Sequence, residues 1–256
     1  MTARQIERAG TMTRPPKALW LAATLGLAGC LTIGCGATAK FIYPANSYGL
    51  VKYEPSLVFQ KTVAVTPFKE QRGDDNEMGT FFLYLVPLMP YGWVEYERPE
   101  AATLFTTMRR FDFNASEDMA KAAAHSLRES NLFKDAFFTF GGEKDKADLI
   151  LEGEIDTATY KGRRWSYGLS VYGPILWLVG LPAGSSHNII RLKLKLKDLQ
   201  ENKVVWEKGF HKSTRVIHGL YYRCGHDVRG YSYLMQEIMN EALEDMKIKL
   251  MLRLDE

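Results

Sequence analysis

The sequence is poor in cysteine and lacks the short motifs that mark the common enzyme classes. It has three cysteines among 256 residues, and only Cys224 lies in the globular part. We expect Cys224 to be a partly buried free thiol, because Cys35 could pair with it only if the N-terminal segment folds back. Gly-x-Ser-x-Gly, Walker, Gly-x-Gly-x-x-Gly and His-Glu-x-x-His motifs are all absent. We therefore expect no catalytic residues and no cofactor.

An excess of positive charge is also missing once the N-terminal segment is set aside. The whole chain has 33 basic and 30 acidic residues, a net charge of +3. Four of these bases and one of these acids precede Cys30, so 29 of each sign remain. A neutral domain lacks the basic surface that is typical of nucleic-acid binding, and we expect no nucleic-acid partner. With 46% hydrophobic and 25% charged residues, the chain can bury an ordinary core.

The longest apolar stretch near the start is too short to cross a bilayer comfortably, which takes about 20 residues. Residues 1–17 are basic, and residues 18–29 are apolar and end in small residues. This order is typical of a secretory signal peptide. Residues 27–30 read Leu-Ala-Gly-Cys and resemble the lipobox of bacterial lipoproteins. In that family the cysteine thiol receives a diacylglyceryl group, and cleavage before the cysteine frees an amine for further acylation.

The resemblance implies that residues 1–29 are a lipoprotein signal peptide and that Cys30 carries lipid, including an acyl chain such as palmitate. Two or more such chains anchor a protein stably to a membrane. Residues 30–58 would then be the lipidated N-terminus and a tether. Leu31 follows the cysteine at the position where an Asp often signals inner-membrane retention in enterobacterial lipoproteins. We therefore expect an outer-membrane anchor that faces the periplasm.

Alternatives to this N-terminus stay open. Cys35 is a second possible lipidation site, although the residues before it match the lipobox less well. Met12 could be the true start, because residues 12–29 form a compact leader by themselves. The apolar stretch could instead remain as an uncleaved membrane helix or a buried segment.

Periodic patterns predict a single α+β domain over residues 59–256. Strands are predicted over residues 61–68, 137–140, 148–160, 188–199 and 204–210, and helices over residues 114–130 and 231–253. Along 188–199, isoleucine and leucine alternate with arginine and lysine, as in a half-buried antiparallel strand with a wet basic face. Asn114 and Glu117 form a capping box for the first helix. We expect a mainly antiparallel sheet of four to five strands with two long helices on one face.

The order of these elements and the strand motif at residues 63–68, Val-Ala-Val-Thr-Pro-Phe, resemble periplasmic α/β modules. Examples are the TolB N-terminal domain, the curli-secretion lipoproteins and the lipoprotein activators of penicillin-binding proteins. This second resemblance implies an envelope module, and it carries no functional residues with it.

Two apolar insertions, residues 81–93 and 167–182, do not fit a small sandwich. Each combines bulky apolar residues with a Tyr-Gly pair, a tryptophan and prolines, and the breaks exclude a transmembrane helix. The insertions could pack on each other and extend the core, or form a patch that touches the membrane, a partner or another copy. The candidate interaction residues are Phe82, Leu85, Trp93, Tyr172, Ile175, Trp177 and Leu178.

One polar cluster has the residue types of a metal site. Cys224, His226 and Asp227 are all zinc-capable, and the first two lie close in sequence. Their spacing matches no structural zinc pattern, so we expect a loop that leads into the last helix and no metal.

Acid pairs could suggest acid–base catalysis. Asp74 and Asp75 lie in an Arg-Gly-Asp-Asp-Asn stretch that is typical of a solvated loop. Glu152 and Glu154 share one face of a strand, and a wet face explains them.

These observations favour a membrane-anchored envelope lipoprotein that is a non-enzymatic assembly or accessory subunit. It would bind protein partners or itself through insertions 81–93 and 167–182. A lipid-binding or lipid-transport accessory protein, whose insertions contact acyl chains, is the alternative. A hydrolase with an unrecognised site is a third hypothesis.

Overall fold

The computed structural model describes residues 38–54, 59–76, 79–102, 110–224 and 226–254. The predicted signal peptide and the candidate lipidation sites Cys30 and Cys35 lie outside these residues. The described residues belong to one compact unit, Thr38–Glu256. Within them, no helix is long and apolar enough to cross a membrane.

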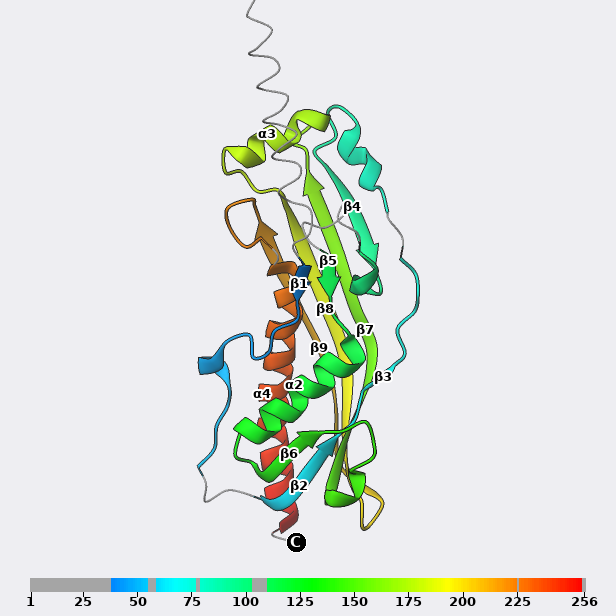
Figure 1. Cartoon of the computed structure of the whole chain (residues 1–256), viewed down its shortest axis with the longest axis vertical. Coiled ribbons are helices and arrows are strands. Elements are labelled where there is room, and N and C mark those ends of the chain that lie inside the picture. The colour runs from blue at the N-terminus through cyan, green and yellow to red at the C-terminus, as the bar shows by residue number, and fades with distance from the viewer. Residues whose placement is uncertain (1–37, 55–58, 77–78, 103–109, 225, 255–256) are drawn as a thin grey trace, which may run out of the picture. The chain divides into compact units, whose positions relative to one another are not determined.

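A mixed seven-stranded sheet dominates the described residues (Figure 1). Its strands are β2 (Phe59–Val65), β3 (Lys69–Glu70), β4 (Tyr91–Tyr96), β6 (Phe133–Phe138), β7 (Leu149–Trp165), β8 (Gly184–Asp198) and β9 (Lys203–His218). The order is β6-β2-β7-β8-β9, and β3 and β4 pair with further stretches of β7. Two more strands, β1 (Thr38–Lys40) and β5 (Arg110–Asp112), form a separate parallel pair.

The prediction of four to five mainly antiparallel strands is wrong in number and in part in direction. β2 runs parallel to both of its neighbours, β6 and β7, whereas β7 pairs antiparallel with β4 and β8. Val63, Ala64 and Val65 of β2 are all fully buried, as in the continuous apolar strands of parallel sheets. The missed strands are β1, β3, β4 and β5; three of them have two or three residues, and β4 begins inside an apolar insertion.

Two long helices, α2 (Ala115–Glu129) and α4 (His226–Leu254), cover one face of the sheet (Figure 1). The Asn114 side chain caps α2 by accepting a hydrogen bond from the Glu117 backbone N–H at 3.3 Å. The returning carboxylate belongs to Asp118, which accepts from the Asn114 N–H at 2.8 Å. The N-capping residue Asn114 was predicted correctly. The reciprocal partner is Asp118 and not the predicted Glu117.

The main core lies between these helices and the sheet. Leu192, Leu194 and Leu196 of β8 point into it and are almost completely buried. Alanines such as Ala123 on α2 let this helix approach the sheet closely. Each buried leucine contributes roughly 1.5–3 kcal/mol relative to an exposed one.

The opposite face of the sheet is wet, as its alternating pattern predicted. In its lower half, the half around residues 193–197 of β8 that lies lower in Figure 1, lysines of β8 pair with carboxylates of neighbouring strands. The pairs are Lys197–Glu152 at 2.7 Å, Lys195–Glu154 at 3.4 Å and Lys193–Glu207 at 2.5 Å. The acid pair on β7 thus belongs to a cross-strand ladder of ion pairs.

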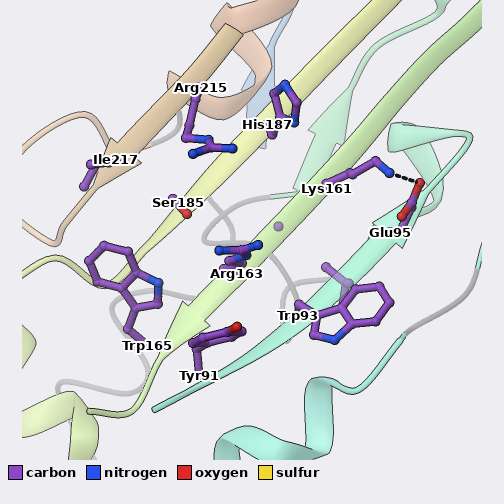
Figure 2. Close-up of a pocket in the computed structure, with 12 residues that line it drawn as sticks. Tyr91, Trp93, Glu95, Lys161, Arg163, Trp165, Ser185, His187, Arg215 and Ile217 are labelled. Carbon is purple, nitrogen blue, oxygen red and sulfur yellow. Dashed lines mark ion pairs between the residues drawn. The ribbon is translucent and has the colours of Figure 1, made fainter. Parts of the chain in front are cut away.

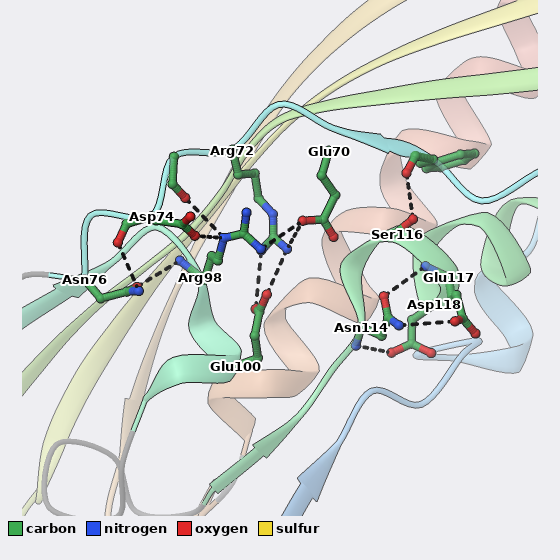
Figure 3. A network of polar contacts seen from close by, with 12 residues as sticks. Glu70, Arg72, Asp74, Asn76, Arg98, Glu100, Asn114, Ser116, Glu117 and Asp118 are labelled. Atoms are coloured by element: carbon green, nitrogen blue, oxygen red, sulfur yellow. Dashed lines mark hydrogen bonds and ion pairs between the residues drawn. The ribbon is translucent and has the colours of Figure 1, made fainter.

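The other acid pair lies beside a buried arginine (Figure 3). Arg72 is 6% exposed and contacts carboxylate oxygens of Glu70 and Glu100, each at 2.9 Å. Although burial alone would lower it, the hydrogen bonds to Glu100 and Glu70 raise the pKa of Arg72 overall. Asp74 forms an ion pair with Arg98. The stretch around Asp74 is therefore a structural tie between two loops.

Between Thr38 and Glu54, the segment predicted as a tether lies against the domain. Gln236 of α4 accepts a hydrogen bond from the Asn46 backbone N–H at 3.0 Å and donates one to its carbonyl oxygen at 2.7 Å. Asn240, one turn further on, donates to the Gly49 carbonyl oxygen at 2.7 Å. Residues 30–37 and 55–58 of the predicted tether lie outside the described residues.

Candidate functional site

The two apolar insertions meet at one end of the sheet (Figure 1). The first forms the 3-10 helix η3 (Phe81–Leu85), and the second forms η6 (Ser170–Tyr172) and the short helix α3 (Gly173–Leu178). We call residues 81–88 and 169–181 together the cap. β4 and the end of β7, which pair antiparallel, carry these two segments to the same place.

Hydrogen bonds tie the two segments of the cap together. The Leu88 backbone N–H donates to the Gly168 carbonyl oxygen at 2.9 Å. The Ser170 hydroxyl donates to the Leu85 carbonyl oxygen. Next to the cap, the Ser166 hydroxyl donates to the Met89 carbonyl oxygen at 2.6 Å. The insertions therefore fold as one unit, and the bonds fix its backbone.

The Tyr-Gly pairs in the two insertions mark places where backbones approach closely. A β-carbon at Gly173 would lie 2.7 Å from the Cα and from the carbonyl oxygen of Ser166. A β-carbon at Gly92 would overlap the carbonyl group of Phe81. Only glycine fits at these contacts without a shift of the backbone.

Trp177 lies on the inner side of the cap. Its indole Nε1 donates to the Trp165 carbonyl oxygen at 2.9 Å, and its ring lies 6.1 Å from that of Tyr84, centroid to centroid. The guanidinium of Arg164, a buried residue, lies 5.8 Å from the same ring. Of the seven predicted interaction residues, Trp177 is therefore the one that holds the cap together.

Most of the other predicted residues face solvent on the cap. Their exposed fractions are 66% for Phe82, 48% for Leu85, 67% for Tyr172, 55% for Ile175 and 50% for Leu178. Residues that were not predicted join them: Val86, Leu88, Leu169, Val171, Val179 and Leu181. The insertions thus pack on each other and also expose an apolar surface. That this surface touches a membrane, a partner or another copy stays a prediction.

Trp93 lies outside the cap, in a groove of about 400 Å³ on the wet face of the sheet (Figure 2). Strand pairing builds this groove from cross-strand rows. One row is Glu95, Lys161, His187 and Arg215; the next is Trp93, Arg163, Ser185 and Ile217; the last is Tyr91 and Trp165. The last row adjoins the cap.

The groove is positively charged. Lys161 pairs with Glu95 at 2.6 Å, and the Arg163 guanidinium lies 5.2 Å from the centroid of the Tyr91 ring. Within the part of the chain that the structure describes, no carboxylate pairs with Arg163 or Arg215. Burial and the charges of Arg215 and Lys161 lower the pKa of His187.

The groove residues other than Trp93 were missed in the sequence, although a signal was present. Lys161, Arg163 and Trp165 alternate along one strand and therefore share a face. Their partners on β8 and β9 could be found only from the register, because His187 and Arg215 are distant in sequence.

The prediction of a loop before the last helix is wrong for His226 and Asp227, because α4 begins at His226 and not at residue 231. His218, at the end of β9, is 2% exposed, and Asp227, in the first turn of α4, is 1% exposed. Burial and the nearby Arg164 lower the pKa of His218 to about 3. Cys224 is half-buried and not in a disulfide. Among the residues described, no group of three or more His, Cys, Asp or Glu is arranged to hold a metal.

No protein-family model matches the chain, and no curated protein matches it in sequence. Among solved structures, a DUF330 protein from Xanthomonas campestris is 11% identical and covers 86% of this chain and 100% of its own, with a TM-score of 0.47. A PelC dodecamer subunit from Paraburkholderia phytofirmans is 12% identical over 74% of this chain and 90% of its own, with a TM-score of 0.37.

Lipoprotein GNA1162 from Neisseria meningitidis is 14% identical, covers 70% of this chain and 98% of its own, and has a TM-score of 0.22. All three TM-scores lie below 0.5, so these likenesses carry no inference about function. The lipobox and the likeness to periplasmic modules therefore remain resemblances.

Proposed function

We propose that this chain is a lipid-anchored accessory protein of the bacterial cell envelope that works by binding and not by catalysis. Its cap binds another protein of the envelope, either a different protein or a second copy of this chain. The anchor is lipid on Cys30, in the outer membrane and facing the periplasm, as the lipobox resemblance implies. The observation that carries the proposal is the exposed apolar surface that two separate insertions build together.

The cap has the properties of a contact surface. Exposed apolar residues that are scattered singly are normal, but a contiguous group marks a site of interaction. Here the apolar side chains project from a backbone that is fixed by hydrogen bonds to itself, such as Leu88 N–H to Gly168 O. A rigid apolar surface loses little conformational entropy when a partner covers it.

A second candidate is a membrane contact, in which the cap touches acyl chains. It is favoured by the aromatic residues Tyr91 and Trp165, which form the row next to the cap, and by Trp93 in the row below them. Tryptophan and tyrosine are enriched where proteins meet the headgroup region of a bilayer.

Cross-linking in intact cells tests the proposal. We compare the full-length chain with a variant that carries Ile175→Ser and Leu178→Ser, both at exposed cap positions. The matched control carries Ile248→Ser and Leu252→Ser, which remove the same two residue types from the exposed side of α4, where they are 60% and 62% exposed.

A defined protein adduct of constant mass is expected for the wild type and for the control variant. Its yield should fall at least tenfold for the cap variant, while the amount of lipoprotein in the membrane stays the same. Equal yields in all three proteins would exclude the cap as the protein contact. If none of the three proteins gives a protein adduct, and the cap variant loses a lipid adduct that the wild type and the control form, the second candidate replaces the proposal.

A further inference from the structure

The wet face of the sheet is divided by charge. In its lower half each of the lysines on β8 has a carboxylate partner, as in Lys197–Glu152 at 2.7 Å. In the upper half, next to the cap, Glu95 faces three bases in its own cross-strand row. This segregation is not a property of the composition, because the chain after residue 29 has equal numbers of acids and bases.

Two guanidinium groups dominate the upper half. Arg163 and Arg215 both line the groove, and Figure 2 shows their guanidinium groups toward the middle of it, on either side of Ser185. Arginine presents a fork of N–H donors that fits the oxygens of a phosphate group. Lys161 adds a cation whose charge is partly offset by Glu95 at 2.6 Å.

The other end of the groove is aromatic. Tyr91 and Trp165 form the row next to the cap, and Trp93 lies in the row below it. Successive residues along a strand are about 3.3 Å apart, so the row of Arg163 lies about 7 Å from the aromatic row and the row of Arg215 about 13 Å from it. The headgroup region of a bilayer is about 5–8 Å thick on each side, similar to the first of these two spacings.

The groove therefore matches a ligand that is anionic at one end and apolar at the other. We propose that it binds the phosphate headgroup of an anionic phospholipid, with the phosphate at Arg163 and Arg215 and the glycerol and upper acyl chains beside Trp165 and Tyr91. A soluble anion would use the arginines and leave the aromatic row without a contact. The proposal goes beyond the proposed function and does not depend on what the cap binds, because the groove lies on the face of the sheet and the cap at its end.

The test measures lipid binding by native mass spectrometry of the purified full-length lipoprotein in neutral detergent. The probes are short-chain phosphatidylglycerol, short-chain phosphatidylcholine and inorganic phosphate. We compare the wild type with the double variant Arg163→Gln, Arg215→Gln. The matched control is Arg191→Gln, an exposed arginine on the same face of β8.

Phosphatidylglycerol should bind the wild type at least tenfold more tightly than phosphatidylcholine does. The double variant should bind phosphatidylglycerol about thirtyfold more weakly, as expected for the loss of two cationic contacts, and Arg191→Gln should bind it as the wild type does. Replacement of both arginines by lysine keeps the charge and should restore most of the preference.

Equal binding of the two lipids, or an unchanged affinity in the double variant, would overturn the proposal. If inorganic phosphate competes as well as phosphatidylglycerol, the ligand is a free phosphate, and the assignment to lipid is wrong. The double variant should keep the cap-dependent cross-link in cells. Absence of a protein cross-link in the wild type, with lipid binding intact, would count against the proposed function alone.

Discussion

The indole Nε1 of Trp177 donates a hydrogen bond to the backbone carbonyl oxygen of Trp165 at 2.9 Å. This bond fastens α3 to the end of β7. Leu178, the next residue in the chain, is 50% exposed. Two neighbours that the sequence places in one class of interaction residues thus have different roles. Trp177 holds the cap on the sheet, and Leu178 belongs to the surface that the cap presents.

Replacement of these neighbours one at a time separates the two roles. Trp177→Phe removes the hydrogen bond and leaves the Trp165 carbonyl without this donor, and we expect it to lower the free energy of unfolding by about 1–2 kcal/mol. Leu178→Ser changes an exposed side chain and should alter stability by less than about 0.5 kcal/mol. Urea unfolding of the purified full-length protein measures both. A larger loss for Leu178→Ser would mean that the cap surface is part of the core.

The close backbone contact at Gly173 gives a second prediction. A methyl group there would meet the Ser166 backbone at 2.7 Å, so Gly173→Ala should destabilise the cap by about 1–3 kcal/mol. Gly142→Ala is the control, because a β-carbon at Gly142 meets no atom within 4 Å. Limited proteolysis followed by mass spectrometry should show faster cleavage within residues 169–181 only for Gly173→Ala. Equal cleavage rates in the two variants would show that this contact does not order the cap.

The sequence predicted the regular elements better than the sheet that they form. The strict alternation in residues 188–199 marked β8, and the helix N-capping residue Asn114 marked the start of α2. The direction of β2 was not accessible, because its three buried residues Val63–Val65 form a run that is too short to distinguish a parallel from an antiparallel strand. β3 has two residues, which is shorter than any periodic pattern.

The cap was predictable and the groove was not. Bulky apolar residues between regular elements are visible in the sequence, so the insertions could be named before their arrangement was known. The groove depends on register: His187 opposes Lys161 on one side and Arg215 on the other. No local pattern connects three residues that only the pairing of β7, β8 and β9 brings together.

His218 makes stability depend on pH. Burial and the charge of Arg164 lower its pKa from 6.5 to about 3 in the folded protein. Below pH 6.5 the unfolded chain therefore binds a proton at this residue that the folded chain does not bind. The stabilisation is complete above pH 6.5 and is lost progressively as the pH falls toward 3.

Urea unfolding at pH 7 and at pH 5 measures this effect. Because one pKa unit corresponds to about 1.4 kcal/mol, His218 should lower the free energy of unfolding by about 2 kcal/mol between the two pH values. His218→Gln, which cannot titrate, should lose this part of the difference. The same pH dependence in the wild type and the variant would show that folding does not lower the pKa of His218.

Metabolic labelling with an alkyne analogue of palmitate tests the anchor. The lipobox resemblance predicts that the wild type is labelled, that Cys30→Ala abolishes the label and that Cys35→Ala keeps it. Label that survives Cys30→Ala but not Cys35→Ala would move the anchor to Cys35. No label in the wild type would contradict the assignment as a lipoprotein.

The cap is proposed as a surface for contact with another protein. A photo-reactive amino acid at position 172 tests it most directly, with position 140 as the control, because Tyr172 and Phe140 are exposed aromatic residues of similar accessibility, 67% and 73%. Phe140 follows β6, away from the cap. Irradiation of intact cells should give a discrete protein adduct from position 172 and none from position 140. If position 172 gives no protein adduct, or if both positions give the same adduct, the cap is not a specific protein contact.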